Sequence, residues 1–469
     1  MRLMNYDLVI LGAGSGGYAA ALRGAELGLR TALVEEGLVG GTCLHRGCIP
    51  TKAILHAAEV ADAARDGSQF GVHATLDRVD LAEVRSYADG VVGRLHKGLT
   101  GLIGSRKIDV IEGRGSLVGA DGNGAAAAVR VGDRQLSADH LVLATGSLPS
   151  TLPAVAVDGV RVLTSEHALR LTELPTSAIV LGGGVIGVEF ASAWRSFGVD
   201  VTVVEALPRL VPNEDPAISK TLERAFRKRK IGLLTGSPMQ AVSTDSDQLT
   251  VTLESGKSVS ADVLLVAVGR RPNSYGMGFE EAGLELDRGW VRTDDRLATN
   301  LRGVYAVGDL VAGLQLAHRG FAHGIFVAEE IAAGRDPGLH RPTVVGDESI
   351  PRITYSDPEI AAVGLSEEAA RQRFGDVETF TYELGGNGRS QILKTQGFVK
   401  VVRRADGPVV GIHLIGARVG ELIGEAQLIT NWEAYPEEVA QLIHAHPTQG
   451  EALGEAHLAL AGKPLHVHT

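Results

Sequence analysis

A strand, glycine loop, helix and second strand follow one another twice in this 469-residue chain, and this repeat constrains the fold most strongly. In the first copy, the apolar strand Tyr6–Leu11 leads into the loop Gly12–Gly17, which reads G-x-G-x-x-G. A helix over Tyr18–Leu27 and a strand over Arg30–Val34 follow, ending at the acid Glu35. In such a loop the first glycine permits a tight turn, the second lets the backbone approach a pyrophosphate, and the third lets helix and strand pack closely. The unit predicts a dinucleotide site with the pyrophosphate at a helix N-terminus.

The second copy has the same order of elements. The strand 179–181 precedes the loop Gly182–Gly187, and the helix Val188–Phe197 is followed by the strand Val201–Val204 and the acid Glu205. Two matching copies are much stronger evidence than one loop, so we expect two dinucleotide sites. A carboxylate at Glu205 hydrogen-bonds the 2′-hydroxyl of NAD and repels a 2′-phosphate, which favours NAD at the second site.

Further along the chain, the pattern of strands changes. Residues 141–147, 263–269 and 304–309 are continuous apolar strands that end near glycine, as buried parallel strands do. After Pro342, shorter strands such as 398–402 and 409–414 alternate with acid-rich helices and indicate a separate α+β domain. The fold class expected is therefore α/β, with two Rossmann-like domains and a C-terminal α+β domain.

Charge and hydropathy exclude several partners. The formal net charge is −11 and there is no basic arm, which disfavours binding to nucleic acid. No apolar stretch approaches the roughly 18 residues needed to span a bilayer. The N-terminus leads directly into a strand that contains an acid, unlike a signal peptide. We expect a cytoplasmic protein with neither a nucleic-acid nor a membrane partner.

Cys43 and Cys48 are the two cysteines of the chain, and a secreted disulfide scaffold would carry more. They indicate a redox pair or two metal ligands, the simple alternative being two small buried apolar side chains. They lie just before a helical run over Lys52–Asp62, and a cysteine at a helix start has a stabilised thiolate. Since a dinucleotide loop is close by in the sequence, redox chemistry is favoured and no metal site is expected.

Together these motifs resemble the pyridine nucleotide-disulfide oxidoreductases, and among them the dihydrolipoyl dehydrogenases, over essentially the whole chain. The resemblance rests on Gly40–Lys52, both glycine loops, Ala144–Gly146, Tyr305–Asp309, Leu316–His318 and His444–Glu451. One departure is His45-Arg46, where many relatives carry Asn and a small apolar residue; the spacing of the cysteines is unchanged.

The resemblance implies FAD at the first loop and NAD at the second. The residues expected to bind FAD are Gly12, Gly14, Gly17, Glu35, Gly41, Thr42, Lys52, Gly115, Thr145, Gly146, Ser147, Asp309 and Ala317. Those expected to bind NAD are Gly182, Gly184, Ile186, Gly187, Glu189, Glu205, Gly269 and Arg270. The implied domains are an FAD-binding domain (1–149), an NAD-binding domain (150–270), a central domain completing the FAD site (271–346) and a dimerisation domain (347–469).

The resemblance also implies a reaction: oxidation of protein-bound dihydrolipoamide to lipoamide with reduction of NAD⁺. Cys48 would lie against the flavin, and Cys43 would exchange with the substrate. His446 would be the general base, with Glu451 holding its ring. The implied partners are a second copy of the chain and the lipoyl domains of 2-oxo acid dehydrogenase complexes or of the glycine cleavage system.

Lys52 is expected near the flavin and paired with Glu189, the alternative being an ordinary helix ion pair. Two other functions remain open. The first is another FAD-dependent disulfide reductase, such as a glutathione, mycothiol or mercuric reductase, although Glu205 argues against the NADPH that these generally use. The second is a catalytically idle flavin-containing structural subunit, against which the presence of Cys43, Cys48 and His446 argues.

Overall fold

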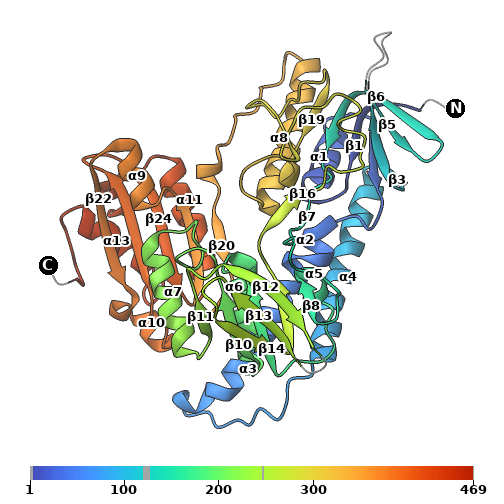
Figure 1. The fold of residues 1–469 in the computed structure, drawn as a ribbon. Helices are drawn as coiled ribbons and strands as arrows, with labels where there is room; N and C mark the ends of the chain where they lie inside the picture. The colour runs from blue at the N-terminus through green and yellow to red at the C-terminus, as the bar shows by residue number, and fades with distance from the viewer. Residues whose placement is uncertain (1–3, 120–126, 246–247, 468–469) are drawn as a thin grey trace. The chain divides into compact units, whose positions relative to one another are not determined.

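The structure is a computed structural model that describes residues 4–119, 127–245 and 248–467 (Figure 1). The chain divides into two compact units. The first comprises Met1–Ala53, Ala82–Ser150 and Arg270–Val345, and the second comprises Ile54–Leu81, Thr151–Gly269 and Gly346–Thr469. The predicted α/β fold class is confirmed. The division into four domains stays a prediction.

The first unit is built on a seven-stranded sheet with the strand order β3-β2-β1-β6-β5-β4, in which β19 also pairs with β6. β3, β2, β1, β6 and β19 pair in parallel, whereas β4, β5 and the start of β6 form an antiparallel extension. The bounds are β1 (Met4–Leu11), β2 (Thr31–Glu35), β3 (Asp109–Glu112), β4 (Gly115–Val118), β5 (Ala128–Val131), β6 (Arg134–Leu143) and β19 (Val304–Ala306). Two small antiparallel pairs join β7 (Ser147–Pro149) to β16 (Arg270–Pro272) and β17 (Leu286–Asp287) to β18 (Trp290–Val291).

Two helices of this unit pack unusually closely. α1 (Ser15–Glu26) and α8 (Ala317–Arg335) lie side by side, and a Cβ at Gly324 would come within 2.2 Å of the Gly16 carbonyl oxygen. Only glycine allows this approach, which brings the N-terminal turns of both helices to the same region of the unit. The remaining helices here are α2 (Gly41–Arg46), α4 (Leu81–Ser105) and the 3₁₀ turn η2 (Gly308–Leu310). α3 (Cys48–Asp66) begins in this unit and continues into the second, to which the chain belongs from Ile54.

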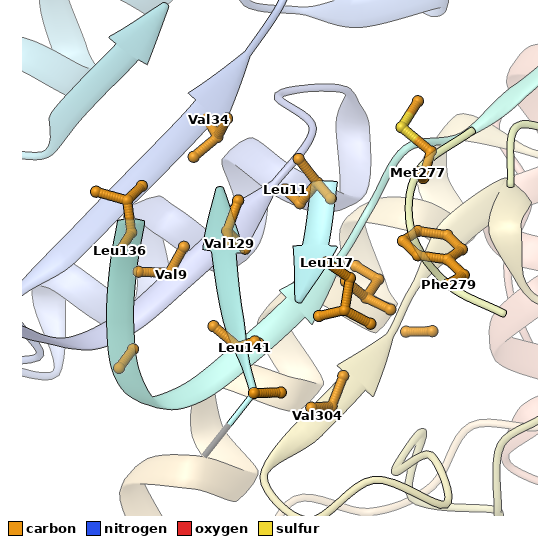
Figure 2. Close-up of a cluster of buried hydrophobic side chains, with 14 of the residues drawn as sticks. Val9, Leu11, Val34, Leu117, Val129, Leu136, Leu141, Met277, Phe279 and Val304 are labelled. Carbon is orange, nitrogen blue, oxygen red and sulfur yellow. The ribbon is translucent and has the colours of Figure 1, made fainter. Parts of the chain in front are cut away.

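A buried apolar cluster fills one face of the first sheet, as Figure 2 shows. Val9, Leu11 and Val34 come from the parallel strands, while Leu117 and Val129 come from the antiparallel extension. Met277 and Phe279, more than 140 residues further along the chain, pack against them. The third segment of the unit is thus part of the same core as the first two.

The second unit contains a five-stranded parallel sheet with the order β11-β10-β9-β15-β8 and an antiparallel meander β12-β13-β14. The strands are β8 (Val162–Thr164), β9 (Ser177–Leu181), β10 (Asp200–Val204), β11 (Gly232–Leu234), β12 (Met239–Thr244), β13 (Leu249–Leu253), β14 (Ser258–Ala261) and β15 (Val263–Val266). The helices are α5 (Ser165–Ala168), α6 (Val185–Ser196) and α7 (Pro216–Lys228), and η1 (Gly67–Phe70) is a 3₁₀ turn.

A second sheet of this unit is antiparallel, with the order β20-β21-β24-β23-β22. Its strands are β20 (Arg352–Thr354), β21 (Glu359–Gly364), β22 (Val377–Glu383), β23 (Phe398–Arg404) and β24 (Val409–Gly416). α11 (Ile423–Asn431) and α13 (Glu451–Leu460) cover one face, while α9 (Glu367–Phe374) packs on the other. The other helical segments are α10 (Gly388–Leu393), α12 (Pro436–Val439), η3 (Asp347–Ser349), η4 (Leu384–Gly386) and η5 (Val419–Leu422).

The helices after the glycine loops begin three residues earlier than the sequence predicts. α1 starts at Ser15 and α6 at Val185, because Gly14 and Gly184 are extended N-cap residues and the rest of each loop already forms the first helical turn. The helical run expected at 52–62 is the longer α3, which starts at Cys48. Across the described residues, no helix is both long enough and apolar enough to cross a membrane.

Candidate active site

The two glycine loops have nearly the same geometry. Gly12 and Gly182 have φ of +103° and +113°, in the region that favours glycine. A Cβ at Gly17 would lie 1.8 Å from the Gly12 carbonyl oxygen, and one at Gly187 would lie 1.9 Å from that of Gly182. The first and third glycines are therefore required for packing within each loop.

The second glycine of each loop, in contrast, has empty space where a side chain would begin. A Cβ at Gly14 or at Gly184 would meet no protein atom within 4 Å. The bare backbone at this point leaves room for a ligand next to the helix N-terminus, which is the position that a pyrophosphate requires. The residues present thus fit a dinucleotide at both loops.

The acid that ends each second strand holds its own glycine loop. Glu35 accepts hydrogen bonds from the backbone N–H groups of Ala13 (2.7 Å) and Gly37 (2.9 Å). Glu205, only 9% exposed, accepts in the same way from Gly183 (2.5 Å) and Leu207 (2.7 Å). Each carboxylate oxygen has a further lone pair. Both acids can therefore accept a ribose hydroxyl while they keep the loop in place.

All residues predicted to bind FAD belong to the first unit. Thr145 donates its hydroxyl to the Asn273 carbonyl oxygen (2.7 Å), and Gly146 has φ of +72°. A pocket beside the first loop is lined by Leu11, Gly12, Val34, Glu35, Glu36, Gly113, Arg114, Gly115, Thr145, Asn273 and Met277. Asn273 and Met277 were not predicted, because they belong to the third segment of the unit and line the pocket only through its packing onto the first two.

Ser147 joins two other predicted residues. Its hydroxyl donates to Asp309 Oδ2 (2.6 Å) and accepts from Arg270 Nε (2.7 Å), while Arg270 Nη2 donates to the Ser147 carbonyl oxygen (2.7 Å). Asp309 lies in η2, just before Ala317 begins α8. Arg270, which we predicted at the NAD loop, thus contacts residues predicted for FAD, and its contact with NAD stays a prediction.

The cysteine segment packs directly against the first glycine loop. Gly40 and Gly41 both have positive φ, and the Gly40 N–H donates to the Ala13 carbonyl oxygen (2.9 Å). A Cβ at Gly41 would lie 2.6 Å from Gly14 Cα. The backbone immediately before Thr42 and Cys43 therefore contacts Gly14, the second glycine of the loop.

The two cysteines are not joined by a disulfide and are partly buried, Cys43 within α2 and Cys48 at the start of α3. A hydrogen bond with Cys48, burial and the Cys48 charge together raise the pKa of the Cys43 thiol, while the Lys52 ammonium opposes the rise. Burial, with a smaller contribution from Cys43, raises the pKa of Tyr18 to about 12. In the reduced protein Cys43 therefore holds its proton more tightly than an ordinary thiol does.

His45 lies between the cysteines and points to a carbonyl group. Its Nε2 lies 2.8 Å from the Val39 carbonyl oxygen, and His96 Nδ1 reaches the same oxygen at 3.0 Å. The two rings are 5.0 Å apart in an edge-on arrangement. His96 was not predicted, since it is 57 residues away from Val39 and nothing in its local sequence marks it.

His446 and Glu451 meet in the second unit as predicted from the resemblance. His446 Nδ1 lies 2.8 Å from Glu451 Oε1, and the Thr448 N–H donates to Glu451 Oε2 (2.8 Å). Burial alone would raise the pKa of Glu451, but the Thr448 N–H and His446 hold it below its ordinary value. An ionised carboxylate only accepts, so Nδ1 carries the proton and a neutral His446 has its lone pair on Nε2.

Most residues predicted for NAD lie together in the second unit: Gly182, Gly184, Ile186, Gly187, Glu189, Glu205 and Gly269. Glu189 is only 3% exposed and accepts a hydrogen bond from the Tyr355 N–H (2.9 Å). Its pairing with Lys52 stays a prediction. In the described part of the chain, no three His, Cys, Asp or Glu side chains are grouped so as to hold a metal ion.

Comparison with known proteins assigns the chain to a family. Residues 6–324 match the family described as Pyridine nucleotide-disulphide oxidoreductase. The chain belongs to this family. Residues 350–457 match the dimerisation domain of the same oxidoreductases, so the chain carries the part through which family members pair. The resemblance stated from the sequence is confirmed.

Relatives in this family match the chain from end to end. The dihydrolipoyl dehydrogenase of Bacillus subtilis is 40% identical over 98% of this chain and 99% of its own length, and that of Pseudomonas aeruginosa is 37% identical over 99% and 100%. Among solved structures, LpdA from Mycobacterium tuberculosis superimposes with a TM-score of 0.88 at 27% identity, covering 97% of this chain and 99% of that one. The HOCl-induced flavoprotein disulfide reductase RclA from Escherichia coli gives 0.85 at 26% identity, covering 97% and 100%.

Proposed function

We propose that this protein is a dihydrolipoyl dehydrogenase, which oxidises protein-bound dihydrolipoamide to lipoamide and reduces NAD⁺ to NADH. FAD and NAD are its cofactors. The observation that carries the proposal is the contact of Gly41 with Gly14, because it holds the Cys43–Cys48 segment against the loop that fits a flavin dinucleotide. A thiol pair at that position is suited to exchange electrons with the cofactor.

The thiol chemistry follows from the two cysteines. His446 Nε2 takes a proton from one substrate thiol, and the thiolate attacks Cys43 Sγ in the Cys43–Cys48 disulfide, which breaks the S–S bond and leaves Cys48 as a thiolate. The second substrate thiol then displaces Cys43 and closes oxidised lipoamide, so that two electrons remain on the cysteine pair. Bound FAD would supply the change from thiol exchange to hydride transfer.

Glu451 supports His446 in this reaction. The carboxylate fixes the ring through Nδ1 and stabilises the imidazolium that forms when Nε2 takes a proton. General base catalysis of this kind contributes about 10²- to 10⁴-fold. The His446 side chain is 76% exposed in the single chain, which suits a base that acts on a thiol brought by another molecule.

The proposed site also involves the dimer, because His446 is exposed in the single chain. We expect the His446–Glu451 pair of one subunit to complete the site at the Cys43–Cys48 pair of its partner, giving two identical sites about a two-fold axis. The macromolecular substrates would be lipoyl domains of 2-oxo acid dehydrogenase complexes or of the glycine cleavage system. The proposal includes a cytoplasmic location, which the low cysteine content supports.

A substrate panel tests the proposal. Purified protein loaded with FAD is assayed with dihydrolipoamide, and in reverse with lipoamide, glutathione disulfide and mycothiol disulfide, each with NAD(H) and NADP(H). We expect rapid turnover with dihydrolipoamide and NAD⁺, and none in a Cys43→Ser control. Preference for another disulfide with NADPH would make the protein a reductase of the second candidate class, to which the likeness to RclA draws attention. FAD binding without any turnover would indicate the idle structural subunit.

A further inference from the structure

A second histidine–glutamate pair lies two residues before the proposed base. His444 Nε2 is 2.7 Å from Glu425 Oε1, which comes from α11. The His444 side chain is only 15% exposed, in contrast to that of His446. A histidine this enclosed and paired is a built feature of the second unit, and the reaction proposed above does not use it.

The His444 ring packs on the helix that carries Glu451. A Cβ at Gly454 would lie 2.5 Å from His444 Nδ1, and one at Gly450 would lie 4.0 Å from Cδ2. α13 begins at Glu451, so its first turns contact His444 at Gly454 and hold His446 through Glu451. Glycine at 454 leaves the space that the ring occupies.

We propose that His444, paired with Glu425 and packed on the first turns of α13, is a positioning residue that sets how strongly the His446–Glu451 pair holds a proton. This inference rests on the proposed function, in which His446 is the base. His444 does not touch the substrate; it acts through Glu451.

The charges around His444 favour its protonated form. The hydrogen bond to Glu425 raises the pKa of His444 against the effect of burial, and the charges of Glu425 and Glu451 and the Leu442 carbonyl act in the same direction. The other titratable groups facing the two pairs are His457, Glu455, His466 and Tyr382. Burial lowers the pKa of His457 to about 4, so this neighbour is neutral near pH 7.

The sign of the effect follows from the charges. A positive His444 stabilises the Glu451 carboxylate and disfavours a second positive charge at His446, so His446 releases its proton at a lower pH. Without the charge on His444, the pKa of His446 rises. The expected shift is a few tenths of a pH unit, as for two charges interacting through a largely aqueous medium.

The test compares His444→Gln and Glu425→Gln with wild type in the holoenzyme. Two readouts are used: the pH dependence of kcat/KM for dihydrolipoamide, and the pKa of His446 from the NMR titration of its ring. In His444→Gln both the acidic limb of the rate profile and the His446 pKa should move to higher pH. Glu425→Gln should move them in the same direction near neutral pH, because His444 then loses its proton there. His56→Gln, which alters the exposed His56–Glu59 pair on α3, is the control and should leave both unchanged.

The possible results distinguish failure of the role of His444 from failure of the proposed function. A rate that falls in His444→Gln with an unmoved profile and an unmoved His446 pKa would reduce His444 to a packing role and overturn the inference. If wild type did not turn over dihydrolipoamide, the proposed function would fail, but the NMR titration would still decide the coupling. A second variant, Gly454→Ala, displaces the His444 ring but keeps its charge, so the test does not depend on the folding of His444→Gln alone. A shift of the His446 pKa that is smaller than in His444→Gln supports an effect of the charge. An equal or larger shift contradicts it.

Discussion

At the scale of single residues, the two cysteines lie in different surroundings. Cys48 is the first residue of α3, where the helix dipole favours a negative charge, and Cys43 has its pKa raised chiefly by its contact with Cys48. The two thiols are therefore different chemical groups although they lie in one short segment. This difference agrees with the roles proposed for them, exchange at Cys43 and electron donation from Cys48.

The replacement Cys48→Ala should lower the pKa of Cys43, because it removes both the hydrogen bond and the charge of Cys48 that raise it. Lys52→Met should act in the opposite direction, because the ammonium now opposes the rise. The pH dependence of iodoacetamide alkylation at Cys43, followed by mass spectrometry in the reduced protein, measures both shifts. Movement of the Cys43 pKa in the same direction in both variants would contradict this account.

Glu205 holds its glycine loop and is proposed to select NAD, and two different replacements separate these roles. Its carboxylate holds Gly183 and Leu207, so Glu205→Ala should weaken NAD and NADP alike by loosening the loop. Glu205→Gln keeps one acceptor and removes the negative charge, so the NAD/NADP ratio of kcat/KM should fall by about tenfold or more, as expected for loss of a hydrogen bond to a charged group. Steady-state kinetics with both nucleotides give the ratio. A wild type that preferred NADPH would refute the role of Glu205.

At the scale of elements, the glycine loops distinguish packing from ligand binding. In Gly187→Ala the new methyl group would meet the Gly182 backbone oxygen, so the variant should lose about 1–3 kcal/mol of stability. In Gly184→Ala it meets no protein atom and φ is an ordinary −76°, so stability should be retained while KM for NAD⁺ rises. Thermal unfolding and KM are measured on both. A normal KM in Gly184→Ala would mean that no pyrophosphate passes this residue.

Lys400 connects three elements of the second unit. Its buried ammonium, on β23, donates to both Asp215 oxygens (3.0 Å each) at the N-cap of α7 and forms an ion pair with Glu367 of α9 (2.8 Å). Lys400→Met leaves the buried Asp215 carboxylate without its ammonium partner and removes one of the two cationic partners of Glu367, so it should cost about 3–5 kcal/mol near neutral pH. Arg371→Met, which removes an exposed partner of the same Glu367, should cost about 1 kcal/mol or less.

The cost of Lys400→Met should depend on pH. Burial would raise the pKa of Asp215, but the Ala217 N–H and Lys400, among other groups, bring it below its ordinary value. The pKa of Glu367 is also lowered, mainly by its hydrogen bond to Lys400. Stability from such groups is present above their unfolded pKa values, near 4, and is lost as the pH falls through the folded values. Urea unfolding at pH 7 and at pH 3.5 should show the difference from wild type shrinking in acid. A difference that grows in acid would contradict the pairing.

The parts that were predictable from sequence are those whose cause is local. Both loops and their acids follow from glycine spacing along one stretch, and the structure differs only in starting each helix three residues earlier. The link between Lys400 and Asp215 spans 185 residues, and that between Arg270 and Ser147 spans 123. Such contacts depend on which elements pack together, so no local pattern predicts them, and Arg270 was placed by the resemblance at the other loop.

At the scale of the whole molecule, we propose that the base and the disulfide of one site come from different copies of the chain. A mixed dimer of a Cys43→Ser chain and a His446→Gln chain should therefore recover about half of the wild-type activity, because one of its two sites combines the intact disulfide with the intact base. Each parent homodimer should be nearly inactive. Differently tagged chains allow the mixed dimer to be purified and assayed. Mixed dimers as inactive as their parents would show that base and disulfide belong to one chain.

The first unit is assembled from three separate stretches of the chain, and Gly12, Thr145 and Asp309 come one from each. During synthesis β1 and β2 leave the ribosome first, but β19 and α8 emerge only after the whole of Thr151–Gly269 has been made. A nascent chain therefore lacks part of the proposed flavin site, and the edge of β6 is not yet paired with β19. Because a ligand stabilises only the state that binds it, we expect FAD to stabilise only those chains whose synthesis has passed Ala317.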